Sequence, residues 1–242
     1  MATVTPTTHR ARRIPRLLTQ AAVRDLLLMA LTVSSGAVDA ISFIALGKVF
    51  TAFMTGNLVF LGLGVADAFG PGGPDILTVG TALVAFSAGV FVAARVGKAS
   101  KGSGLWPRRV SLALGGTVLA QAGFLAGWAA VSGHPSTDFV TWLVAIAALA
   151  MGLQSGAVLS LGVTGVFTTA ATATVMFLTR DAAARPASVA EPVRLAGVLI
   201  SLFAGAALGG LLLVHGRTYA PVLPLALTLL VVAVASVTLG RR

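Results

Sequence analysis

Eight runs of mostly apolar residues account for most of the chain, with short polar or Gly/Pro-rich connections between them. A helix needs about 20 apolar residues to cross the hydrocarbon core of a bilayer, and most of these runs approach that length. The runs do not alternate apolar and polar residues as the strands of a membrane barrel do. Helices satisfy their own backbone hydrogen bonds in lipid. The pattern therefore predicts an all-α, polytopic transmembrane helix bundle.

The composition indicates a protein whose partner is the lipid bilayer and argues against a protein that binds nucleic acid. Hydrophobic residues make up 57% of the chain and charged residues only 10%, whereas a soluble domain carries about 25% charged residues. The net charge of +10 comes from basic residues that lie between the apolar runs or at the chain ends. That distribution is typical of membrane topology signals and not of a basic patch that follows phosphates.

The chain divides into a basic N-terminal tail, residues 1–24, and a single membrane domain, residues 25–240. We expect the apolar segments of that domain at residues 25–47, 49–65, 76–94, 110–131, 139–159, 161–179, 195–214 and 222–239. The segments at 49–65 and 161–179 are each interrupted by small or polar residues. The second is also short for a full crossing, because only 14 residues lie between Gly165 and Arg180.

The positions of Lys and Arg favour six crossings over eight. The tail carries five of these residues, the stretch 95–109 five, the stretch 180–194 three and the C-terminus two, which leaves Lys48 and Arg217. If 49–65 and 161–179 dip in and return, only Lys48 and Arg217 face outward, as the positive-inside rule prefers. Eight crossings would divide the charges almost evenly. We therefore predict a multi-pass inner-membrane protein with six spanning helices, two re-entrant segments and cytoplasmic N- and C-termini.

A weak internal repeat agrees with that topology. The sequence Ser35-Gly36-Ala37-Val38 recurs at 155–158, and Val49-Phe50-Thr51 recurs at 166–168. Three crossings in each half, about 25–131 and 139–240, would give the halves opposite orientations. This is the inverted repeat that many transporters have, with their broken helices near the midplane.

Asp39 is an acid well inside the first apolar run, and its counterpart in the second half is Leu159. A charged side chain at that depth costs a few kcal/mol, so it should face the protein interior. One interpretation is a site for a proton, a cation or an amine of a small solute. The alternative is a structural hydrogen bond to Ser35, Ser42 or an amide of the broken helix.

Polar groups at the two interruptions complete the candidate pathway. Thr55-Gly56-Asn57 predicts a helix break, and irregular backbone at membrane depth needs protein or water to satisfy it. Gln154 is a large polar side chain inside another run. Such groups either line a route for a solute or join helices by hydrogen bonds. The candidate residues are Asp39, Thr55, Gly56, Asn57, Gln154, Thr168, Thr169 and Thr172.

Several function classes find no support in the sequence. Cysteine is absent, and the three histidines are scattered through the tail and loops, so we expect no metal site and no cofactor. No nucleophile, base and acid have the spacing of a catalytic set, so we expect no enzyme. Glycine pairs four residues apart predict tight helix crossings within the chain or in a homo-oligomer; they are Gly123/Gly127, Gly152/Gly156 and Gly205/Gly209.

The chain resembles the YoaK family of bacterial inner-membrane proteins, also known as DUF1275. The resemblance rests on residues 36–42 (Gly-Ala-Val-Asp-Ala-Ile-Ser), on Val49-Phe50 with 54–57 (Met-Thr-Gly-Asn), and on 152–154 (Gly-Leu-Gln) followed by Thr168-Thr169. It covers nearly the whole chain. The family's second motif closes with a Thr-Gly pair, where this chain has Thr172-Ala173. The resemblance implies a multispanning membrane protein and supplies no substrate and no active residues.

Two function hypotheses follow from these observations. The first is a small-solute permease or transporter with a site near Asp39 at the midplane, where Asp39 couples a proton or cation to transport. The second is a non-transporting scaffold or regulatory module that acts through its glycine-rich helix faces.

Overall fold

The structure is a computed structural model that describes residues 19–70, 72–98, 104–163, 169, 171–184 and 190–239. These residues form helices joined by turns and loops and contain no strand, which confirms the predicted all-α bundle. The helices are α1 (Gln20–Ala45), α2 (Met54–Val65), α3 (Ile76–Lys98), α4 (Arg108–Ala130), α5 (Thr137–Leu159), α6 (Ala171–Ala184), α7 (Ala190–Gly216), the 3-10 turn η1 (Arg217–Tyr219) and α8 (Val222–Thr238). Most of the basic tail, residues 1–18, lies outside this part of the chain.

The helices fall into two length classes. Five of them, α1, α3, α4, α5 and α7, are long and apolar enough to cross a membrane by length and composition. Helix α8 has 17 residues, which is the lower end of the range that spans a bilayer. Helices α2 and α6 have only 12 and 14 residues. Six long helices and two short ones agree with the predicted architecture.

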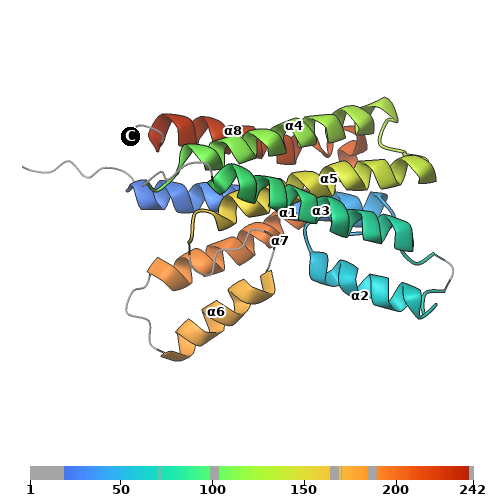
Figure 1. Cartoon of the computed structure of the whole chain (residues 1–242), viewed down its shortest axis with the longest axis horizontal. Helices are drawn as coiled ribbons and strands as arrows, with labels where there is room; N and C mark the ends of the chain where they lie inside the picture. Colours follow the sequence, from blue (N-terminus) through green and yellow to red (C-terminus); the bar gives the residue numbers. More distant parts are fainter. Residues whose placement is uncertain are drawn as a thin grey trace, which may run out of the picture.

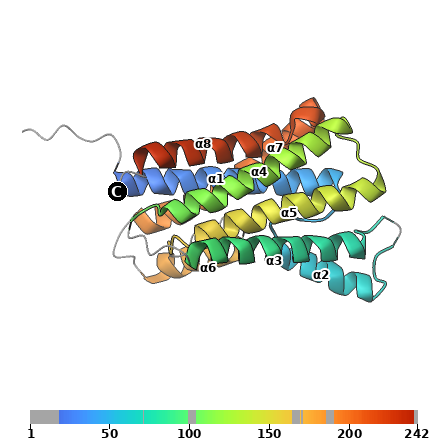
Figure 2. The same ribbon diagram turned by 45° about the horizontal axis from the view of Figure 1, so that its top comes forward.

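The two short helices occupy opposite ends of the bundle. In Figure 1 the long helices run side by side along the long axis. Helix α2 starts near the middle and runs to the end at which α1 finishes, whereas α6 starts near the middle and runs to the other end. The turned view in Figure 2 shows the same separation. Each short helix therefore finishes at the same end of the bundle as the long helix that precedes it, α2 after α1 and α6 after α5.

The predicted break at Thr55-Gly56-Asn57 is wrong in position. These residues form the first turn of α2, and the non-helical stretch is 46–53. Helix α1 ends because Gly47 and Lys48 both have positive φ, at 83° and 61°, a conformation that ends helices and suits glycine. The irregular backbone thus precedes the polar motif, whose side chains can bond back to it.

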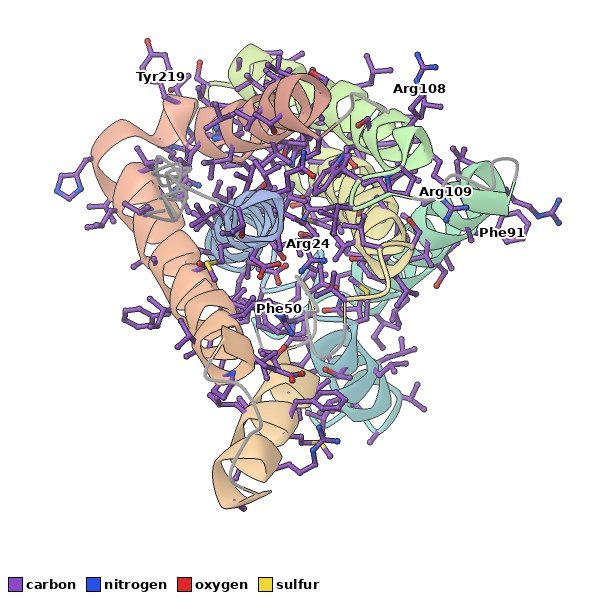
Figure 3. All side chains as sticks on the ribbon, turned by 90° about the vertical axis from the view of Figure 1, so that its left-hand side faces the viewer. Arg24, Phe50, Phe91, Arg108, Arg109 and Tyr219 are labelled. Carbon is purple, nitrogen blue, oxygen red and sulfur yellow. The ribbon has the colours of Figure 1, made fainter. Side chains whose placement is uncertain are left out.

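Helices α1 and α5 form the centre of the bundle (Figure 3). In each, 67% of the most apolar window is buried, compared with 22–33% in α3, α4 and α7. Helix α1 packs mainly against α7 and then α8, whereas α5 packs mainly against α3 and then α4. The first helix of each half therefore packs against the third helix of the other half.

Small residues allow these exchanged contacts to be close. Gly36 of α1 lies against the backbone of α7 at Leu202 and Ala206, and Gly156 of α5 lies against the backbone of α3 at Val90. Two of the predicted glycine pairs, Gly152/Gly156 and Gly205/Gly209, serve such crossings inside the chain. An added Cβ at Gly123 would meet no atom within 4 Å.

Charge is distributed unequally between the two ends. In Figure 1, α1, α4 and α7 begin at one end of the bundle, and α3 and α6 finish there. The sequence near these helix ends contains the described arginines Arg24, Arg95, Arg108, Arg109, Arg180 and Arg194, whereas Lys48 and Arg217 directly follow the other ends of α1 and α7. At the arginine-rich end Asp25 of α1 pairs with Arg24 at 2.7 Å and with Arg194 of α7 at 3.9 Å. The pair between Arg194 and Asp25 joins α1 and α7 at the rim of the bundle.

Candidate functional site

Asp39 is buried inside the bundle and holds the segment that leads into α2. Its side chain is 3% exposed. One carboxylate oxygen, Oδ1, accepts hydrogen bonds from the backbone N–H groups of Thr51 and Ala52, both at 2.8 Å, and from the Thr51 hydroxyl at 3.2 Å. These donors lie just before the N-terminus of α2, where the helix dipole also favours a negative charge. Asp39 thus satisfies irregular backbone that lipid could not satisfy.

Asn57 fixes the same segment from the other side. Its Oδ1 accepts from the N–H of Phe50 at 3.0 Å, and its Nδ2 donates to the carbonyl of Phe50 at 2.6 Å. The ring of Phe50, labelled in Figure 3, stacks on Phe43 at 4.9 Å and on Phe60 at 5.9 Å between centroids. A two-point amide clamp and an aromatic stack therefore hold residue 50, and the polar atoms of Asn57 are occupied.

The second break is held by fewer described interactions. The hydroxyls of Ser155 and Thr169 lie 3.0 Å apart, and Ser155 also donates to the carbonyl of Met151 at 2.7 Å. Leu159, the counterpart of Asp39, is 63% exposed. The predicted pathway residue Thr168 lies outside the described residues. Thr172 is exposed on the first turn of α6.

Gln154 contacts α1 one helical turn away from Ser35. It is fully buried, and its Nε2 donates to the carbonyl of Leu31 at 3.1 Å. Residues 31, 35 and 39 are spaced four apart, so they follow one face of α1. Gln154 Oε1, Ser35 Oγ and Asp39 Oδ2 are all buried, and none has a hydrogen-bond partner in the described part of the chain. Gln154 thus contacts the face of α1 that also carries Ser35 and Asp39.

The other predicted residues have different environments. Thr55 is exposed, and Gly56 lies under the ring of Phe50, where a Cβ would come within 3.0 Å of the ring. Sequence reasoning missed Thr51, which binds Asp39 through both its N–H and its hydroxyl. The repeat of Val-Phe-Thr at 49–51 and 166–168 was the available signal.

The proposed structural partners of Asp39 are only partly correct. The amides of the broken segment do bind its carboxylate, as one alternative predicted. The hydroxyl of Ser42 instead donates to the backbone carbonyl of Asp39 at 3.1 Å. The described residues form no ion pair to Asp39. Within them no three His, Cys, Asp or Glu side chains group as metal ligands. The site is therefore a single acid whose described partners, two backbone N–H groups and one hydroxyl, are uncharged.

Comparison with known proteins places the chain among integral membrane proteins. Residues 27–235 match the family described as "Protein of unknown function (DUF1275)". The "UPF0700 transmembrane protein YoaK" of Bacillus subtilis (strain 168) is 36% identical over 169 residues, which cover 69% of this chain and 71% of that protein. No solved structure matches the chain. The match spans α1 to α8 and includes Asp39, Asn57 and Gln154, and the protein belongs to the DUF1275 family of multi-pass membrane proteins.

Proposed function

We propose that the protein is a small-solute permease of the bacterial inner membrane in which Asp39 couples solute movement to a proton or cation. The observation that carries the proposal is the buried carboxylate beside a broken helix, with Oδ2 free of any described protein partner. Acids inside the membrane usually mark ion or solute pathways. A carboxylate needed only to hold the backbone at residues 51–52 uses just its other oxygen.

The arrangement of the helices supports the same proposal. Helix α1 packs on α7, α5 packs on α3, and the short helices α2 and α6 reach opposite ends. An inverted repeat has this exchange of partners, and transporters of that kind bind substrate where their broken helices meet. The excess of arginine at one end favours that end as the cytoplasmic side, with both termini there.

The scaffold alternative rests on glycine faces that are already used within the chain. Gly205 lies against the backbone of Val33, and Gly209 lies against that of Ala37, both on α1. Substitutions there would disturb the fold itself before any assembly with a partner. A permease therefore explains more of the described contacts, and the scaffold becomes one outcome of the transport experiment.

Transport is tested with the purified full chain in sealed vesicles. Proton entry is driven by a potassium diffusion potential and followed with a trapped pH-sensitive dye, and a panel of neutral and charged small solutes is followed by light scattering. We expect flux above that of protein-free vesicles. Asp39→Asn, which keeps the Oδ1 acceptor, should lower the flux to that background.

Asp138→Asn is the matched control, because Asp138 is exposed in the first turn of α5. It should transport like the unmodified chain. Equal flux in Asp39→Asn and the unmodified protein would remove Asp39 from the mechanism. Vesicles without flux of protons or of any solute in the panel would contradict the permease and favour the scaffold.

A further inference from the structure

Three buried oxygen atoms near the junction of α1 and α5 lack a described protein partner: Ser35 Oγ, Asp39 Oδ2 and Gln154 Oε1. Their residues are 0%, 3% and 0% exposed. Buried polar atoms are nearly always hydrogen-bonded or bound to an ion or water, so each unpartnered one calls for an explanation. Gln121 Oε1 is also unpartnered, but its Nε2 bonds to Ser34, whose hydroxyl donates to Pro224 of α8.

The three atoms are a carboxylate oxygen, a hydroxyl oxygen and an amide oxygen, which are ligands that hard cations prefer. Gln154 Nε2 is turned to the carbonyl of Leu31 at 3.1 Å, which leaves its oxygen as the end available to a ligand. Amide and carboxylate oxygens accept hydrogen bonds but donate none unless protonated, so they cannot satisfy each other directly.

A buried carboxylate needs a counter-charge or a proton, because an unpaired charge in an apolar medium is very costly. The described residues supply dipoles to Oδ1 but form no ion pair with the carboxylate. An ordered water would satisfy hydrogen bonds without balancing the charge. A proton on Oδ2 would also balance the charge, but it would turn that oxygen into a donor that serves one neighbouring acceptor at most. A cation balances the charge and can be shared by Oδ2 and the hydroxyl oxygen of Ser35.

Ser35 and Asp39 are one turn apart on the same face of α1, a rise of about 5.4 Å. Hard cations take oxygen ligands at about 2.3–2.6 Å, so side chains one turn apart can share a single ion. A single carboxylate matches a monovalent ion better than a divalent one, which usually takes more charged ligands or several waters.

We infer that Asp39 Oδ2 and Ser35 Oγ bind a partly dehydrated Na⁺, with Gln154 Oε1 as the neighbouring oxygen on the α5 side. The inference deepens the proposed permease, since it rests on that function for its role and names the coupling ion. Bound Na⁺ would be the ligand of the two unpartnered oxygens on α1, Ser35 Oγ and Asp39 Oδ2. It would also join α1, α5 and the segment leading into α2, which Asp39 already holds through Oδ1.

The test is equilibrium binding of radioactive Na⁺ to the full chain in detergent, at constant ionic strength with choline chloride as the replacement salt. We expect about one Na⁺ per chain. Ser35→Ala should weaken binding about tenfold or more, because it removes one of few ligands, and Asp39→Asn should abolish it. Ser34→Ala is the matched control: its hydroxyl bonds to Pro224 at 3.2 Å and lies toward α8, so its Na⁺ affinity should be unchanged.

Thermal unfolding in the same buffers provides a second measurement, followed through the intrinsic fluorescence of the three tryptophans. Na⁺ should raise the midpoint of the unmodified chain and of Ser34→Ala, because a ligand that binds only the folded state stabilises it. The increment should shrink in Ser35→Ala. This comparison is internal to each variant, so a variant that is less stable from the start still gives an answer.

The inference is overturned if the unmodified chain binds no Na⁺, or if Ser35→Ala binds it as tightly as Ser34→Ala does. Dye-reported proton uptake that depends on Asp39, in a protein that binds no Na⁺, would overturn the Na⁺ site and leave the permease in place. Stoichiometric Na⁺ binding without any solute or ion flux would support the Na⁺ site and contradict the permease.

Discussion

The two breaks occupy matching places in the two halves, yet they are held by different chemistry. In the first, a buried acid and a buried amide make five hydrogen bonds to residues 50–52. In the second, the described contact is between the hydroxyls of Ser155 and Thr169, at 3.0 Å. The acid has become Leu159, which is largely exposed. Among the described residues, a buried acid is therefore found at the first break and not at the second.

This difference separates architecture from function. At the second break the described tie between the loop and its long helix is a pair of hydroxyls, those of Ser155 and Thr169. The carboxylate of Asp39 bonds to the backbone through Oδ1 alone, and its Oδ2 has no described hydrogen-bond partner. The predictions that follow compare the halves directly, and they run from the largest expected effect to the smallest.

Making the first break resemble the second should give the largest effect. Asp39→Leu gives position 39 the residue type found at the matching position, Leu159. It leaves the N–H groups of Thr51 and Ala52 without their acceptor. Each buried unpaired donor costs about 1–3 kcal/mol, so we expect a loss of about 3–5 kcal/mol. Unfolding in mixed micelles measures it. Asp39→Asn keeps Oδ1 and should cost clearly less; an equal cost would show that the charge holds the fold.

The amide clamp should matter more than the hydroxyl pair. Asn57→Leu removes both hydrogen bonds to the backbone of Phe50 and should cost about 2–3 kcal/mol. Ser155→Ala removes one hydroxyl contact to Thr169 and should cost about 1 kcal/mol. The same unfolding assay compares the two variants. A larger loss in Ser155→Ala would reverse the proposed order of rigidity between the breaks.

The matching glycines should respond alike if the two halves are an inverted repeat. Gly36→Ala pushes a methyl group against the backbone of α7, and Gly156→Ala pushes one against α3. Overpacking of this kind costs about 1–3 kcal/mol, so each variant should lose about 2 kcal/mol. Gly123→Ala is the control, since an added Cβ there meets nothing within 4 Å. Unequal losses at Gly36 and Gly156 would argue against equivalent halves.

The smallest effect is expected at the rim of the first half, where Asp75 caps α3. Its Oδ2 accepts from the hydroxyl and the N–H of Thr78, at 2.8 and 2.7 Å. These bonds lower the pKa of Asp75 below its usual value. Asp75→Ala should cost about 1 kcal/mol at neutral pH, the typical value of an N-cap.

The pH dependence of that cost has a definite sign. A lowered pKa means that the folded state favours the ionised carboxylate, so the contribution is complete above the ordinary aspartate pKa. It disappears as the pH falls through the lowered value. The stability gap between the unmodified chain and Asp75→Ala should therefore shrink in acid. A gap that grows in acid would show that the cap acts through another group.

Much of the fold could be predicted because lipid imposes strong rules on sequence. Run length and charge placement gave six long helices and two short ones, and the short helices are indeed α2 and α6. The boundaries at the breaks were less accurate: the segment 49–65 becomes helical only at Met54. Its first residues are apolar, and the side chains that keep them out of the helix, Asp39 and Asn57, act through tertiary contacts.

The site could be predicted only in part. Asp39 stands out because an acid is rare in an apolar run, and Gln154 stands out for a similar reason. Thr51 does not, because its role comes from a backbone N–H that any residue carries. The unpartnered oxygen of Ser35 cannot be predicted either, since a sequence does not show which buried hydroxyl finds a hydrogen-bond partner.

The most direct test of the account is the sidedness of the two short helices. The chain has no cysteine, so single cysteines at Lys48, Asp67, Ser160 and Ala183 can be labelled in intact cells with a membrane-impermeant maleimide. We predict that Lys48→Cys and Asp67→Cys are labelled from outside, and that Ser160→Cys and Ala183→Cys react only after the membrane is opened. Labelling of Lys48→Cys and Asp67→Cys from opposite sides would mean that α2 crosses the membrane, and it would contradict the inverted arrangement.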